Sequence, residues 1–293
     1  PRPVELDNSL GLNLSAYFPW LYSHMVAILQ GITKLPYQTV AWIYAIILYI
    51  FSLGLLKSAS SRILFSLFCT IPIINEHLFM SGANYLQTTF LGFLLYSCSF
   101  IRNNNLKILS SFIASLLLIN SHVLALAIII PILIYQYYYS YRDKAFILIA
   151  GFIILYKMVD SYYLTGSISF PFAQNIFPNR NYNEYSLGLV EGHLSRAIFQ
   201  EGARFSLGSL AFIIFTLGLY YYIYVHSIFN KYDKYLISVL LVPTLLVVFL
   251  GYRHRIIFLS LSVLIFTVCL TRNNIRLSDI FNLASQYFYK YIF

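Results

Sequence analysis

Charged residues are scarce in this sequence: Asp, Glu, Lys and Arg together make up 10% of its 293 residues. A water-soluble domain carries about 25% charged residues. Hydrophobic residues reach 59% here, and the mean hydropathy is +0.73. The chain lacks the polar surface that would coat a globule of this size in water, so the composition argues against an ordinary water-soluble domain.

Cysteine is also rare, and its placement excludes several kinds of site. Cys69, Cys98 and Cys269 all lie inside apolar runs, where we expect small buried hydrophobic side chains. No Cys/His cluster has ligand spacing, so we expect no disulfide and no structural metal site. The sequence contains no Walker A loop, dinucleotide fingerprint or zinc-protease motif. We therefore expect no bound cofactor, with an assisting divalent metal left open.

Long apolar runs are the dominant feature, each near the roughly 20 residues that span a bilayer core. They predict an all-α, polytopic transmembrane helical bundle of about eight or nine membrane helices plus one interfacial helix. Asn120-Ser121-His122 interrupts one long run and predicts a tight hairpin. Residues 13–31 are less apolar and predict a helix lying along the membrane surface. The predicted membrane helices are 37–56, 63–79, 84–101, 108–120, 122–139, 145–163, 206–228, 235–252 and 254–271.

We interpret residues 1–293 as a single transmembrane domain with one long external loop, 164–205. The chain begins Pro1-Arg2-Pro3 and shows no signal-peptide pattern, so either the start was processed or this is an excised piece. The first residues are typical of a loop, which favours an excised piece.

The charges alternate from side to side along the predicted helices. The connections 57–62, 102–107, 140–144 and 229–234 and the C-terminal tail hold eleven cations and three acids. The opposite side holds eight cations and seven acids. The positive-inside rule then places the N-terminus outside and the C-terminus in the cytoplasm. The net charge of +9 follows from this topology, and we expect no nucleic acid partner. We expect a multi-pass integral membrane protein with any chemistry on the outer side.

Asp7 and Glu76-His77 are the acidic candidates on that side. Asp7 precedes the interfacial segment and suits a general base or metal-assisting carboxylate, or else a helix cap. Glu76 and His77 lie near the outer end of a predicted span. A charge inside a span costs roughly 2.5–3.5 kcal/mol at the centre, which favours function unless the interface solvates it.

Three other features are candidate binding elements. His122 at the hairpin tip is either a ligand-binding side chain or an interfacial one. Arg253-His254-Arg255 is either a phosphate-binding cluster or a headgroup anchor, since Arg forks bind phosphate in two-point geometry. The loop 164–205 combines aromatic, amide and acidic residues, which suits a sugar; its candidate residues are Tyr182, Glu191 and His193.

This layout resembles the C-type (GT-C) membrane glycosyltransferases and related bacterial polysaccharide polymerases. In that superfamily an acidic residue lies in the first external loop, after the first transmembrane helix, and a membrane-surface helix follows it. Asp7 and residues 13–31 are similar to these parts, which implies that the first transmembrane helix is missing from this sequence. The run Met80–Leu86, the basic turn Arg102–Lys107, the His122 hairpin and Arg253-His254-Arg255 also resemble elements of these enzymes. The superfamily often has an acidic pair, and here Glu5 and Asp7 are separated by Leu6.

The resemblance implies transfer of a sugar from a polyprenyl-phosphate donor to a lipid-linked or glycan acceptor, among the lipids of a bacterial inner membrane. Asp7 would be the base, with Glu5 as substitute, and Arg253 and Arg255 would neutralise the leaving phosphate. Glu76, His77 and His122 would line one outward-facing cavity with them. The alternatives are a repeat-unit polymerase, a flippase or transporter of lipid-linked sugars, and a non-catalytic membrane subunit.

Overall fold

The computed structural model describes residues 20–71, 75, 84–122, 124–140, 142–165, 216–224, 229–245 and 252–273. These residues form helices and the turns between them, with no strand among them. The all-helical prediction is therefore confirmed for the part of the chain that the structure describes.

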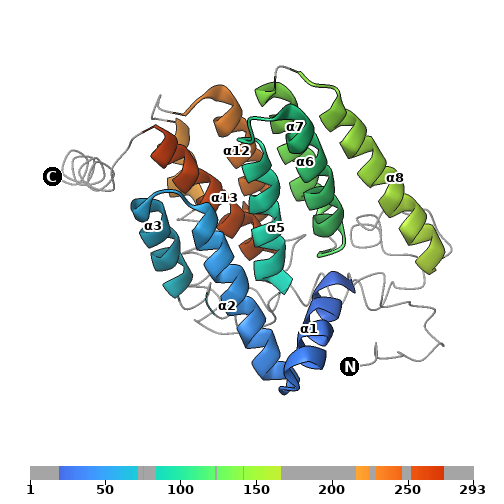
Figure 1. Ribbon diagram of the computed structural model, residues 1–293. Coiled ribbons are helices and arrows are strands. Elements are labelled where there is room, and N and C mark those ends of the chain that lie inside the picture. The colour runs from blue at the N-terminus through green and yellow to red at the C-terminus, as the bar shows by residue number, and fades with distance from the viewer. Residues whose placement is uncertain are drawn as a thin grey trace, which may run out of the picture.

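The helices follow the apolar runs closely (Figure 1). Their bounds are α1 Trp20–Thr33, α2 Tyr37–Leu55, α3 Ala59–Thr70, α5 Asn84–Cys98, α6 Asn104–Ile119, α7 Leu126–Tyr139, α8 Ala145–Thr165, α12 Lys231–Leu245 and α13 Tyr252–Arg272. Residues 216–224 are also helical, within the predicted helix 206–228. The predicted hairpin is confirmed, because α6 and α7 are joined by a turn that contains Asn120-Ser121-His122.

Helices α6 and α12 begin four residues earlier than the apolar runs predict, because a polar side chain caps each of them. Asn103 Oδ1 accepts a hydrogen bond from the Leu106 N–H at 3.1 Å and starts α6 at Asn104 rather than 108. Asn230 Oδ1 accepts from the Tyr232 and Asp233 N–H groups at 2.9 and 2.8 Å. It starts α12 at Lys231 rather than 235. Such caps satisfy N–H groups that have no partner within the helix.

Helix α5 lies at the centre and packs against α2, α6, α7 and α13. Gly92 marks its closest approach: a β-carbon there would lie 3.0 Å from a Leu261 methyl carbon of α13 and 3.1 Å from one of Ile128 of α7. Further along, Tyr96 contacts Cys269 of α13 and Tyr135 of α7. The helices α5, α7 and α13 therefore run in the same direction.

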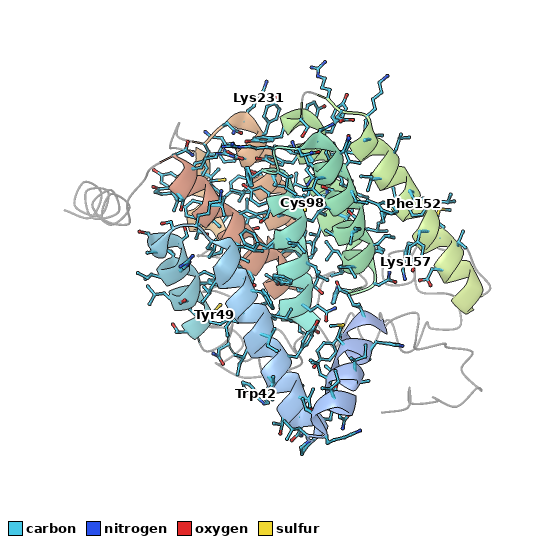
Figure 2. All side chains as sticks on the ribbon, viewed as in Figure 1. Trp42, Tyr49, Cys98, Phe152, Lys157 and Lys231 are labelled. Atoms are coloured by element: carbon cyan, nitrogen blue, oxygen red, sulfur yellow. The ribbon has the colours of Figure 1, made fainter. Side chains whose placement is uncertain are left out.

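The cation-rich connections gather at one end of the bundle, which we call the cation-rich end. Asn104 Nδ2 donates to Asp143 Oδ2 at 2.8 Å, which joins the turn before α6 to the turn before α8. The Arg272 guanidinium lies over the Phe100 ring and pairs with Asp233. Ser61 Oγ donates to the Thr267 carbonyl at 3.0 Å, which brings the start of α3 to the end of α13. Figure 2 labels Lys231 at this end, and Trp42 lies toward the other.

Large apolar side chains cover much of the outside of the bundle. Ile50 on α2 is 60% exposed and Leu148 on α8 is 73% exposed, and Trp42 and Phe152 also face outward (Figure 2). Among the described helices, α2 alone is long and apolar enough to cross a membrane by length and composition, and α3, α6, α7 and residues 256–272 are shorter apolar helices. Only 28% of the apolar window of α2 is buried inside the protein.

Candidate functional site

His122 lies inside the protein, at the end opposite the cation-rich end. Its side chain is only 4% exposed, and its ring centroid is 5.7 Å from that of Tyr85 at the start of α5. The Leu124 N–H donates to Nδ1 at 3.1 Å, which leaves Nε2 to carry the proton of the neutral ring. The imidazole therefore does not point outward to lipid, as an interfacial anchor would.

The polar residues next to His122 come from α5 and from the same turn. Thr88 Oγ1 lies 3.2 Å from Ser121 Oγ, and Ser121 Oγ itself donates to the Leu118 carbonyl at 2.7 Å. Thr88 and Ser121 are both buried. We call Tyr85, Thr88, Ser121 and His122, together with Gln87, which precedes Thr88 on α5 and faces α2, the polar cluster. It combines hydroxyl, amide and imidazole groups, the donors and acceptors that sugar hydroxyls require.

Gln87 is the member of the polar cluster that has spare hydrogen-bonding capacity. Its side chain is 1% exposed, and its Oε1 accepts a hydrogen bond from the Tyr44 hydroxyl of α2 at 2.8 Å. Its Nε2 is buried and has no hydrogen-bond partner among the described residues. An unsatisfied buried donor costs about 1–3 kcal/mol, which makes the Gln87 amide a candidate binding group.

Helices α1 and α8 also contact the hairpin turn at the His122 end of the bundle. The Leu21 N–H of α1 donates to the Asn120 carbonyl at 3.2 Å, and the Tyr156 hydroxyl of α8 donates to Asn120 Oδ1 at 3.2 Å. The Tyr22 ring lies 6.0 Å from that of Tyr44, so α1 runs back along the first half of α2. The placement of α1 along a membrane surface stays a prediction.

The start of α13 lies at the His122 end as well. Leu261 is level with Gly92 of α5, and the two helices are parallel. Tyr85 lies seven residues before Gly92, and Arg253-His254-Arg255 lie six to eight residues before Leu261. At about 1.5 Å per residue both steps are about 10 Å, so the first turn of α13 is level with Tyr85. The backbone thus brings Arg253, His254 and Arg255 to the same end of the bundle as His122.

The other candidates from the sequence lie outside the described residues. They are Glu5, Asp7, Glu76, His77, Tyr182, Glu191 and His193. That these residues line one cavity together with His122 remains a prediction. Among the described residues no group of three or more His, Cys, Asp or Glu side chains is placed to hold a metal ion. The three cysteines are buried and free.

A second polar group, at the cation-rich end, was missed by the sequence reasoning. Asp233 has no exposed surface, forms an ion pair with Arg272 and accepts a hydrogen bond from the Tyr135 hydroxyl. In the sequence, Lys231-Tyr232-Asp233-Lys234 is typical of a solvated connection. The Asn230 cap instead places Asp233 in the first turn of α12, against α7 and α13. Asn often caps helices, so Asn230 just before Lys231 is the sequence signal that α12 begins there.

Comparison with known proteins found no family model, no curated protein and no solved structure that matches this chain.

Proposed function

We propose that this protein is a multi-pass membrane glycosyltransferase that takes sugar from a polyprenyl-phosphate donor at the non-cytoplasmic face. The membrane placement is supported by the exposed apolar side chains and by α2, which is long, apolar and mostly uncovered. A core helix of a water-soluble protein is buried on its apolar face, whereas a lipid-facing helix is not.

One observation carries the proposal: the buried polar cluster and the first turn of α13 occupy the same end of the bundle, opposite the cation-rich end. The polar cluster supplies groups that hydrogen-bond sugar hydroxyls. The sequence Arg253-His254-Arg255 supplies cations for a phosphate. A sugar phosphate on a lipid requires both, at the depth where the headgroups lie.

The proposed reaction is a displacement at the anomeric carbon of the donor. A hydroxyl oxygen of the acceptor forms a bond to this carbon, and the bond from the carbon to the phosphate oxygen breaks. The lipid phosphate leaves with the electron pair, and Arg253 and Arg255 neutralise its charge. Asp7, with Glu5 as the substitute, takes the proton of the acceptor hydroxyl.

The core between the two ends of the bundle favours an enzyme over a flippase. A flippase needs a polar path that opens to both sides. Around Gly92, however, α5 packs tightly against Leu261 of α13 and Ile128 of α7, and the atoms nearest to a β-carbon built there are methyl carbons of these two residues. A polymerase of repeat units would use the same one-sided site, so it differs from the proposal only in the acceptor.

The test is sugar transfer by the full chain in liposomes supplied with labelled polyprenyl-phosphate sugars and a lipid-linked acceptor. We expect transfer, with Asp7→Asn and Arg255→Gln each lowering kcat by at least roughly a hundredfold. Asp143→Asn at the cation-rich end is the matched control and retains activity. Full activity of both Asp7→Asn and Arg255→Gln overturns the assigned roles, and label crossing the bilayer without transfer identifies a flippase.

A further inference from the structure

A groove of about 480 Å³ runs between α6 and α8 on the outer surface of the bundle. Asn105 and Ala145 border it at the cation-rich end, and Ile108, Leu109, Phe112 and Leu148 line its length. Asn105 and Phe112 are seven residues apart on α6, which corresponds to about 10 Å. Phe112 also packs against Phe152 of α8, with ring centroids 5.3 Å apart, beyond the last groove residue of α8.

Four cations lie in or next to the two connections that lead into α6 and α8, the helices of this groove. Lys107 and Lys144 directly precede the groove residues Ile108 and Ala145, and Arg102 and Arg142 lie in the two adjoining turns. Lys107 Nζ donates to Ser140 Oγ at 3.1 Å, which holds the ammonium group against the turn between α7 and α8. The side chains of Arg102, Arg142 and Lys144 are exposed.

Asp143 is the acidic residue in these two turns, and its oxygens are already occupied. Oδ2 accepts from Asn104 Nδ2 at 2.8 Å, and Oδ1 accepts from the Ala145 N–H at 3.0 Å. These hydrogen bonds, the one from Asn104 foremost, hold the pKa of the Asp143 carboxyl below its ordinary value. The two connections and the residues next to them therefore carry four cations and one acid, a surplus of three positive charges at the cation-rich end of the groove.

We propose that this groove binds one anionic phospholipid, with an acyl chain along Ile108, Leu109 and Leu148 and the phosphate between Lys107 and Lys144. An apolar groove that opens onto cations matches a molecule with an apolar chain and an anionic head. Free phosphate would leave the apolar groove unfilled, and a neutral lipid would leave the surplus charge unmatched. The inference rests on the membrane placement and is independent of sugar transfer.

The experiment measures binding of phosphatidylglycerol to the full chain in detergent, by native mass spectrometry and by the shift of the unfolding temperature. Phosphatidylcholine with the same acyl chains and inorganic phosphate are the comparison ligands. We expect retention and stabilisation by phosphatidylglycerol alone. The double variant Lys107→Gln/Lys144→Gln is expected to bind phosphatidylglycerol at least roughly tenfold more weakly.

Two further variants separate the groove from general surface charge. Lys231→Gln/Lys234→Gln removes the same charge from α12 at the same end and is expected to bind normally. Leu148→Trp fills the groove without changing the charge and is expected to release the lipid. Equal weakening in both double variants, full binding by Leu148→Trp, or the same stabilisation by inorganic phosphate overturns the proposal. Because binding is read without any sugar substrate, its failure leaves the proposed transferase activity untouched.

Discussion

The Tyr135 hydroxyl of α7 donates a hydrogen bond of 3.0 Å to Oδ1 of Asp233, a carboxylate of α12 with no exposed surface. The other oxygen of Asp233 pairs with Arg272 of α13, so one carboxylate joins three helices. Arg272 keeps 29% of its side chain exposed, which places the pair at the edge of the core. Charged groups are buried at a large cost unless a partner compensates them, so this contact fixes which helix ends meet.

The first prediction concerns the loss of one partner. Arg272→Met leaves the buried Asp233 without its cation and is expected to lower the free energy of unfolding by about 3 kcal/mol, at the lower end of what breaking a buried pair costs. The double variant Asp233→Leu/Arg272→Met should be more stable than Arg272→Met, because no charge is left uncompensated. Thermal unfolding in detergent measures both. Lys231→Gln, which removes an exposed charge, serves as the control, and an equal loss in this control would contradict the role of Asp233.

The second prediction concerns the close approach at Gly92. Gly92→Val adds carbons where Leu261 and Ile128 already lie within 3.1 Å of a β-carbon, and overpacking of this kind costs about 1–3 kcal/mol. Gly151→Val on α8 is the matched control, because nothing lies within 4 Å of a β-carbon there. Unfolding temperatures of the two variants should differ clearly. Equal values would mean that α5, α7 and α13 do not pack as described.

The third prediction separates binding from packing at Gln87. Gln87→Leu removes a buried donor that has no partner among the described residues, but it also removes the acceptor of the buried Tyr44 hydroxyl, so a loss of about 1 kcal/mol of stability is expected. If Nε2 holds a substrate hydroxyl, the transfer rate with the donor sugar should fall by roughly tenfold or more. Tyr44→Phe removes the hydroxyl that donates to Gln87 Oε1 and should lower the transfer rate by a smaller factor. Unchanged transfer by Gln87→Leu would remove Gln87 from the site.

The fourth prediction concerns the orientation in the membrane. Asn103→Cys lies at the cation-rich end, and Leu35→Cys lies in the turn between α1 and α2, toward the other end. A membrane-impermeant thiol reagent applied from outside is expected to label Leu35→Cys and not Asn103→Cys. The native cysteines are buried, so the wild-type chain is the blank. Labelling of both positions from the same side would refute the topology.

Much of the helical layout follows from the sequence alone. Apolar runs and the polar interruption Asn120-Ser121-His122 predict the helices and the α6–α7 hairpin, because backbone groups in apolar surroundings must bond within a helix. The charge alternation also predicts which connections share an end, and Asn104–Asp143 and Asp233–Arg272 join such connections directly. The helices and the hairpin depend on residues that are close in the chain. The grouping of connections depends only on the end of the bundle at which each connection lies.

The tertiary structure decided the features that depend on how far each helix is rotated and where it begins. Asp233 is buried because the Asn230 cap starts α12 early and turns this carboxylate toward Tyr135. Gln87 and Thr88 are neighbours in sequence, yet one contacts Tyr44 of α2 and the other Ser121 of the hairpin. Adjacent residues on a helix point about 100° apart, so the partner of each side chain is set by helices distant in sequence.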